Sequence, residues 1–319
     1  MSTDGDPNRN DWDKPLSESL PELVAAIGEA AIPRSRMDEV IALASPAFAL
    51  YPRSASGPAA GDVVSSYLRG RAREHGGRSQ LGGLPLLPPD MAWPSRGDVP
   101  LSLVAQLDFD VLRDRAGPRL PDHGLLQLYL DLEADSFGGD EFDPVVLWFG
   151  DGEALAPRED GVAQWGNHPV EVDVTHFLSV PSAGLLDLAH WPEDELDAYQ
   201  EAIGDAFVFG QVGGWRRDFQ NDPAVSIALR EAGLDYADRL GVRHPGGTDP
   251  AAWHQWRRDL RAELDRRTDI ANWRLVLEQR YSPGLGGDWA DGGVAWFMGQ
   301  QARTTQGDFS NIRGQMASH

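Results

Sequence analysis

The spacing of apolar residues predicts helices in the first quarter of the chain. In "SESLPELVAAIGEA" the apolar residues recur at helical spacing, and Ser17 or Ser19 is placed to cap the helix. The segments that follow, to about residue 78, mix short helical pieces with the extended run "AFALY". We predict that residues 16–78 form a helical region that packs on the rest of the protein, preceded by a disordered acidic tail at residues 1–15.

From about residue 80 the apolar pattern changes to short strands separated by turns rich in Gly and Pro. A Pro-stiffened loop leads into a strand at about 101–107, and "GLLQLYLDL" places Leu126, Leu128 and Leu130 on one face of the next strand. Further strands are predicted in "DPVVLWFGDG", "HPVEVDVTHF", "DAFVFGQ" and "NWRLVLEQRY" and at residues 294–298. Tight turns between them favour a mixed α+β fold with a mainly antiparallel sheet as its core.

Two later segments have helical patterns and are expected at the periphery of this sheet. "WPEDELDAYQEAI" begins with Pro192 and has three acidic residues in its first turn, which suits a helix N-terminus. Residues 223–268 are rich in Ala, Leu, Arg and Glu and are broken at "VRHPGGT". We interpret residues 223–268 as a helical insertion.

The chain contains a weak internal sequence repeat, which we call the echo. "LGGLP", "VAQLDF" and "DHGLLQLYLD" follow one another in the same order as "VGGWR", "VLEQRY" and "DGGVAWFMG". Each series has a Gly-Gly turn, an apolar strand that carries Gln106 or Gln279, and a turn into a second apolar strand. A duplicated β unit explains this order, and so does the general frequency of Gly-Gly turns before strands.

Composition excludes several classes of function. The formal charge of −22, from 28 basic and 50 acidic residues, disfavours nucleic acids and anionic lipid surfaces as partners. The longest apolar runs are about five residues, too short to span a membrane, and the acidic N-terminus lacks a signal-peptide pattern, so we expect a cytoplasmic protein. The chain has no cysteine, which excludes disulfides and thiolate sites, and we expect neither a metal nor a cofactor.

Four ordered blocks resemble the hallmark segments of the YwqG-like family, a bacterial family of unassigned function. They are "GGLPLLPPDMAWPSRGDVPLSLVAQLDFDVL", "LPDHGLLQLYLDLE", "GQVGGWRRDFQNDP" and "WADGGVAWFMGQQARTTQGDFSNIRGQMASH", and they extend from about residue 79 to the C-terminus. Trp215 and Arg216 depart from the family pattern. The resemblance implies a mixed α+β fold and carries no catalytic residues over to this chain.

Acidic residues near the C-terminus form one candidate site. Asp288, Asp291 and Asp308 would suit a divalent metal or a general acid and base if they met in a cleft, with His123 or Gln279 beside them. Asp-Gly-Gly is also a hairpin signature, and Asp308 is placed to accept hydrogen bonds from its own turn.

Histidines give two weaker candidates. His168 and His176 would lie on the face of a strand opposite to Glu171 and Asp173, so one metal ion cannot collect all four residues without a bulge. His123 follows Asp122 in a turn, with no nucleophile motif nearby.

Tryptophans in the ordered loops are the remaining candidates. Trp93, Trp165, Trp215, Trp289 and Trp296 lie in or beside Gly/Pro-rich segments, where they either stiffen the loops or anchor a partner. Our first hypothesis is a protein-binding module of inhibitory, regulatory or immunity type, and the second is an enzyme or ligand-binding protein that uses the carboxylate cleft. The candidate binding residues are Trp93, Gln106, His123, Trp215, Gln279, Asp288, Trp289, Asp291 and Asp308.

Overall fold

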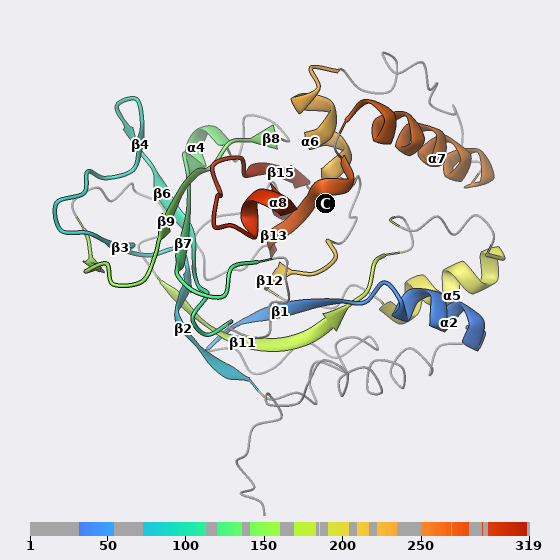
Figure 1. Cartoon of the computed structure of the whole chain (residues 1–319), viewed down its shortest axis with the longest axis horizontal. Coiled ribbons are helices and arrows are strands. Elements are labelled where there is room, and N and C mark those ends of the chain that lie inside the picture. Colours follow the sequence, from blue (N-terminus) through green and yellow to red (C-terminus); the bar gives the residue numbers. More distant parts are fainter. Residues whose placement is uncertain are drawn as a thin grey trace, which may run out of the picture.

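One large antiparallel sheet organises the protein (Figure 1). The computed structural model describes residues 32–53, 73–112, 120–135, 141–159, 169–182, 185, 191–203, 209–216, 222–234, 250–268, 270–280, 289 and 293–317. The sheet has eleven strands in the order β8-β15-β14-β13-β12-β1-β11-β2-β6-β7-β9. Their bounds are β1 Ser45–Pro52, β2 Glu74–Leu81, β6 Ser102–Asp108, β7 Leu125–Leu130, β8 Glu141–Phe142, β9 Val145–Phe149, β11 Val170–Ser179, β12 Gly210–Gly213, β13 Trp273–Arg280, β14 Val294–Gln300 and β15 Arg313–Ala317. The mixed α+β class with a mainly antiparallel core is thereby confirmed.

Short helices and two small strand pairs surround the sheet. The helices are α2 Arg34–Ile41, α4 Leu132–Asp135, α5 Glu193–Ile203, α6 Pro223–Glu231, α7 Pro250–Arg267, η4 Ile270–Asn272 and α8 Gln301–Thr304. The small pairs are β3 (Leu86–Leu87) with β10 (Ala156–Pro157), and β4 (Ser95–Arg96) with β5 (Val99–Pro100). No helix in the described part of the chain is long and apolar enough to cross a membrane.

Ten of the eleven strands form two units of five that exchange their first strand, and β8 is added beyond β15. The first unit consists of β1, β2, β6, β7 and β9, and the second of β11, β12, β13, β14 and β15. β1 pairs with β12 of the second unit, β11 pairs with β2 of the first, and β1 and β11 pair with each other at the centre. The strand order is therefore the same when it is followed from either side of the β1–β11 pair.

The register of the strands supports the duplication in detail. Gln80 faces Gln106 in the first unit, and Gln211 faces Glu278 in the second. The β6–β7 ladder shifts its register between Leu103 and Ala105, and the β13–β14 ladder shifts at the corresponding place, between Leu275 and Leu277. Irregularities at equivalent positions are unlike what unrelated hairpins would share.

The two Gly-Gly turns also match. The Gln80 side chain donates hydrogen bonds to the carbonyl oxygens of Gly82 and Leu84, at 3.0 and 2.8 Å. Gln211 donates in the same way to the residues at the same offsets, Gly213 and Trp215, at 2.9 and 2.8 Å. The glycines of both turns have φ between +64° and +75°, a region open to glycine and strained for other residues. The predicted echo is thus a structural repeat, but Glu278, not Gln279, occupies the position of Gln106.

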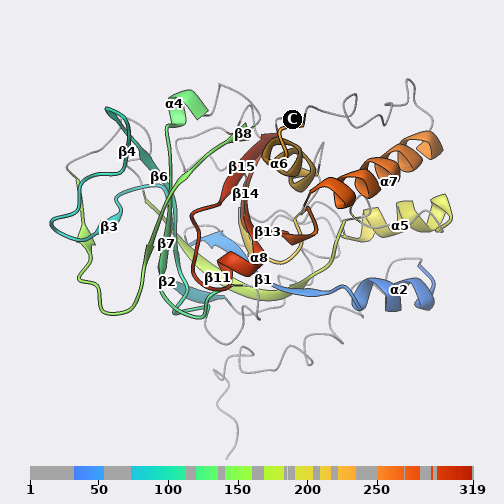
Figure 2. The same cartoon turned by 45° about the horizontal axis from the view of Figure 1, so that its top comes forward.

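The concave face of the sheet encloses the main core, which both units share. Its buried side chains include Phe48 of β1, Leu128 of β7, Val174 of β11 and Phe297 of β14. Leu132 of α4 packs against this core, whereas α2 and α5 share another cluster with β1 and β11, and α6 and α7 cover β13 and β14 (Figures 1 and 2). This arrangement explains why most strands are buried on both faces.

A two-residue connection joins the strands at the two ends of the sheet. β8 pairs with β15, and β9 pairs with β7 at the opposite end of the strand order, yet only Asp143 and Pro144 separate β8 from β9. Asp143 forms ion pairs with Arg230 of α6 and Arg313 of β15, so this connection is held to the second unit. We call the region where β9 of the first unit approaches the β14–β15 connection of the second unit the seam.

Most expected elements agree with the structure, and the N-terminal segment differs in its content. The predicted helix at residues 192–203 is α5, and the predicted helical insertion contains α6 and α7 between β12 and β13. Within the expected helical region at residues 16–78, the described residues form one helix, α2, but also β1 and most of β2. The run "AFALY" belongs to β1, which is central in the sheet because it pairs on both sides. The expected tail at residues 1–15 lies outside the described residues.

The exchange of β1 and β11 predicts that neither unit folds alone. A chain cut between Glu159 and Pro169 leaves each fragment with a first strand whose partner strands lie largely in the other fragment. We expect each fragment to be unfolded by circular dichroism when expressed separately, and the two to form a stable one-to-one complex when coexpressed. A fragment ending at residue 159 that gave a cooperative unfolding transition by itself would contradict the exchange.

Candidate functional site

Three of the loop tryptophans make contacts within the protein, and Trp165 lies outside the described residues. Trp93 donates a hydrogen bond to the carbonyl of Leu101 at 3.0 Å and packs against the outer face of β7 and β9. Trp215 donates to the carbonyl of Leu43 at 2.7 Å. Trp289 is only 5% exposed and stacks on Phe142 with ring centroids 6.3 Å apart. These three contacts stiffen loops, as one of the two alternatives from the sequence proposed.

Gln106 belongs to a buried hydrogen-bond network on the outer face of the first unit. Its side-chain oxygen accepts hydrogen bonds from the Leu86 amide at 3.1 Å and from the Gln127 side chain at 2.8 Å. The Tyr129 hydroxyl donates to Gln127 at 2.6 Å, and burial raises the pKa of this phenol above its ordinary value. The network fixes the loop after the Gly-Gly turn, which is a structural role for Gln106.

Glu278 is the counterpart of Gln106, and sequence reasoning missed it. It is fully buried and accepts hydrogen bonds from the indole of Trp296 at 3.2 Å and from Arg280 at 3.3 Å. Gln279 points to the opposite face of β13 and is 2% exposed. Its side-chain oxygen is buried without a hydrogen-bond partner among the residues that the structure describes.

The three C-terminal carboxylates are described only in part. Asp288 and Asp291 lie outside the described residues. Asp308 accepts hydrogen bonds from the backbone and side chain of Ser310, at 3.1 and 2.7 Å, and from Arg303 at 2.7 Å. The hydrogen bonds from Ser310 and Arg303 lower the pKa of Asp308 to about 2. Asp308 therefore stabilises its own turn, as the structural alternative proposed.

The histidine and acid candidates on β11 do not form a metal site in the described residues. Glu171 and Asp173 both pair with Arg53, and His176 lies on the opposite face, with its ring 5.4 Å from that of Phe48. His168 is outside the described residues. Within the described ranges, no group of three or more His, Asp or Glu side chains is arranged to hold a metal ion.

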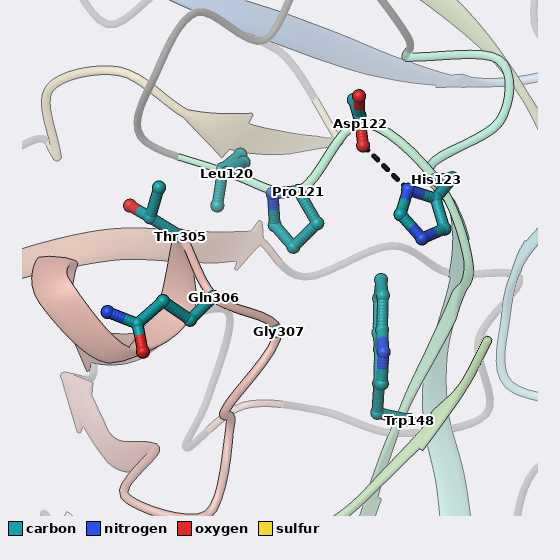
Figure 3. A pocket seen from close by; sticks show the side chains of 8 residues that line it. All are labelled: Leu120, Pro121, Asp122, His123, Trp148, Thr305, Gln306 and Gly307. Atoms are coloured by element: carbon teal, nitrogen blue, oxygen red, sulfur yellow. Dashed lines mark hydrogen bonds and ion pairs between the residues drawn. The ribbon is translucent and has the colours of Figure 1, made fainter.

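A pocket at the seam brings one predicted residue, His123, together with side chains from both units (Figure 3). The first unit contributes residues 120–123 and Trp148 of β9, and the second contributes residues 305–307 after α8. The pocket encloses about 410 Å³, within the range of sites that hold a small ligand group. Its base is apolar and its rim is polar.

Backbone hydrogen bonds fix the first side of the pocket. Gly124, which follows His123, donates its amide proton to Asp110 at 3.2 Å, and its carbonyl accepts from Phe109 at 2.8 Å. Arg78 holds Asp108 and Asp110 through hydrogen bonds of 2.9 to 3.0 Å. The turn that carries Asp122 and His123 is therefore anchored at its end, and the Asp122 carboxylate lies 2.6 Å from Nδ1 of His123.

A helix terminus forms the second side of the pocket. The Gly307 amide donates to the Thr304 carbonyl at 3.0 Å, and the Asp308 amide donates to the Arg303 carbonyl at 3.0 Å, which together form a Schellman motif at the end of α8. Gly307 has φ of +75°, as this motif requires. The termination of α8 places Thr305 and Gln306 in the pocket lining, and the Thr305 hydroxyl donates back to the Gln301 carbonyl at 2.7 Å. The Gln306 side chain makes no hydrogen bond to another residue within the described ranges.

Trp148 forms the wall between these two sides. Its ring is 5.0 Å from Phe309 and 5.7 Å from Phe109, so residues of both units hold it in place. In Figure 3 one face of the indole is turned toward Gln306, and Nε2 of His123 lies on the side of Trp148. A flat aromatic face beside an imidazole is able to stack a planar or cationic group.

The comparison with protein families matches most of the chain. Residues 79–317 match the model of a family described as a domain of unknown function, DUF1963. The chain belongs to this family. The matched DUF1963 region begins near the end of β2, so it leaves out β1, which pairs with both β11 and β12. No curated protein matches the chain.

Sequence reasoning identified one of the pocket residues and missed the others. His123 was a candidate because it lies beside Asp122 in a turn. The sequence predicts only a strand around Trp148; β9 is at the end of the sheet, so this side chain reaches the pocket. Thr305 and Gln306 carry no motif, because the Schellman turn and not their identity brings them to this place.

The pKa of Asp308 predicts a pH-dependent contribution to stability. Since the folded-state pKa of about 2 is below the ordinary value of 3.8, the carboxylate stabilises the folded protein above about pH 4, and this contribution is lost as the pH falls toward 2. We expect Asp308→Asn to lower Tm at about pH 7 and to equal the wild type near pH 2, as measured by thermal unfolding. Asp98→Asn, at an exposed position, is the control, and a difference for Asp308→Asn that did not change with pH would contradict the assignment.

Gly124 is predicted to be essential for the position of Trp148. A Cβ at this residue would lie 2.4 Å from the Trp148 ring, and its φ is +99°. We expect Gly124→Ala to lower the free energy of unfolding by about 2–4 kcal/mol, through overpacking and backbone strain. Gly152→Ala tests the strain alone, because Gly152 has φ of +86° and open space around it, and should cost only about 1 kcal/mol. Equal losses in urea unfolding of the two variants would show that the Trp148 contact is unimportant.

Proposed function

We propose that the protein is a binding module that anchors a partner protein through one side chain seated in the seam pocket against Trp148. The observation that carries the proposal is the preformed aromatic wall, which Phe109 and Phe309 hold from two units. Rigid aromatic pockets that are already formed in the free protein receive anchor residues at low entropic cost.

The exposure of the rim favours a side chain of a protein over a free small molecule. His123 and Asp122 have side chains that are 46% and 72% exposed, and Thr305 and Gln306 are exposed as well. A free ligand usually buries most of its surface in its site, which a pocket with such an open rim does not provide. A partner protein would cover the rim and exclude water from the seated group.

Two more specific expectations from the sequence remain predictions. The inhibitory or immunity-type role and the YwqG-like assignment go beyond the family match. An enzyme that uses Asp288, Asp291 and Asp308 is supported less than binding, because the Asp308 carboxylate is already engaged by Arg303 and Ser310.

Site-specific crosslinking tests the binding proposal. A photo-crosslinking amino acid at position 306, in cells of the native host, should give an adduct with one protein. That protein, once purified, should bind the wild-type chain and bind Gln306→Trp at least about 30-fold more weakly, since the new ring fills the pocket. Ala302→Trp, which adds the same ring to an exposed position of α8 outside the pocket lining, should bind like the wild type. Equal affinity of Gln306→Trp and wild type would refute the pocket as the binding site.

A further inference from the structure

The charges around the seam pocket favour a cationic ligand. Among the described residues that line it there is no Lys or Arg, and Asp122 stands on its rim. Arg303, which lies in α8 just before the pocket wall, is bound to Asp308 and Ser310. The whole chain carries a formal charge of −22, so its field attracts cations and repels anions. The described lining offers no compensating charge to an anionic group.

The aromatic wall favours the same sign of charge. The face of an indole attracts cations, and this attraction is greater for Trp than for Tyr or Phe. Trp148 is oriented for it, because one face of its ring is turned into the pocket (Figure 3). The contacts of Trp148 with Phe109 and Phe309 keep that face in place before a ligand arrives.

The arrangement of acceptors favours a guanidinium over an ammonium group. The described lining includes oxygen acceptors on Gln306, Thr305 and Asp122, of which Asp122 also contacts His123, and a planar guanidinium can stack on an indole while it donates along its edges. The protein uses this combination within its own fold: Arg36 lies 5.4 Å from the ring centroid of Trp191 and pairs with Glu39 and Glu195.

We propose that the anchor residue seated against Trp148 is an arginine side chain of a basic segment of the partner protein. This inference rests on the proposed function and specifies the chemistry of the ligand. Trp148 stacks the guanidinium, Gln306 and Thr305 accept hydrogen bonds from it, and Asp122 supplies the opposite charge. The acidic surface of the chain then assists association with a basic partner, in a manner that salt screens.

Isosteric peptides test the inference directly. The probes are capped pentapeptides with four glycines and a central arginine, citrulline, lysine, leucine or phenylalanine, added to about 10 mM to the full-length protein. Binding is followed by proton–nitrogen NMR at the Trp148 indole and Gln306 amide signals, which are assigned by their loss in Trp148→Phe and Gln306→Ala. We expect the arginine peptide to bind about 10-fold more tightly than the citrulline peptide, which has the same shape without the charge.

Matched variants test whether the arginine peptide binds beside Asp122. Asp122→Asn should weaken binding of the arginine peptide several-fold, and Asp98→Asn, with the same change of net charge on the β4–β5 hairpin away from α8 (Figures 1 and 2), should not. Raising the salt concentration from about 20 to about 200 mM should weaken the arginine peptide and leave the citrulline peptide unchanged.

Each of the other outcomes counts against the arginine inference. Equal binding of the arginine and citrulline peptides, or tighter binding of the leucine or phenylalanine peptide at the same signals, overturns the arginine inference and leaves the anchor pocket standing. If no peptide moves these signals, the arginine inference also fails, and crosslinking at position 306 then decides the proposed function independently.

Discussion

The antiparallel pair of β1 and β11 at the centre of the sheet is the contact on which the rest of the structure depends. Each of these strands begins one unit and completes the ladder of the other, so both units share one continuous set of backbone hydrogen bonds. The core is shared for the same reason, because side chains of both units meet on the concave face. The seam pocket lies between the units, and its geometry therefore depends on their joint folding.

Much of the fold was predictable from residue patterns, because most strands are short and apolar and lie near Gly or Pro, although β2 (EHGGRSQL) lacks this signal. The fold class, most strands and the helical insertion follow from these local signals. The central position of β1 did not, since "AFALY" has the same composition in a peripheral strand as in a central one. The equivalence of Gln106 and Gln279 was wrong by one residue, because matching letters do not fix register and Glu278 takes the place of Gln106.

The candidate site was less predictable than the fold, and the reason is geometric. His123 attracted attention through its neighbour Asp122, which is close in sequence. Trp148 and Gln306 come from distant parts of the chain, and only the approach of β9 to the end of α8 brings them together. Of the loop tryptophans, for which the sequence left loop stiffening and partner binding open, Trp215 is bound to backbone and Trp289 is buried. Sequence position near a glycine-rich loop does not separate these cases.

The short connection between β8 and β9 also affects whether separate molecules can pair through their sheet edges. The end strands of an open sheet present unpaired backbone groups that can recruit a strand from a neighbouring copy. Here both end strands belong to one segment, interrupted only by Asp143 and Pro144, and Pro144 has no amide proton to donate. Because Asp143 is paired with Arg230 and Arg313, the segment cannot swing away as a free ribbon without breaking these ion pairs. The ion pairs of one aspartate thus hold in place the segment that forms both margins of an eleven-stranded sheet.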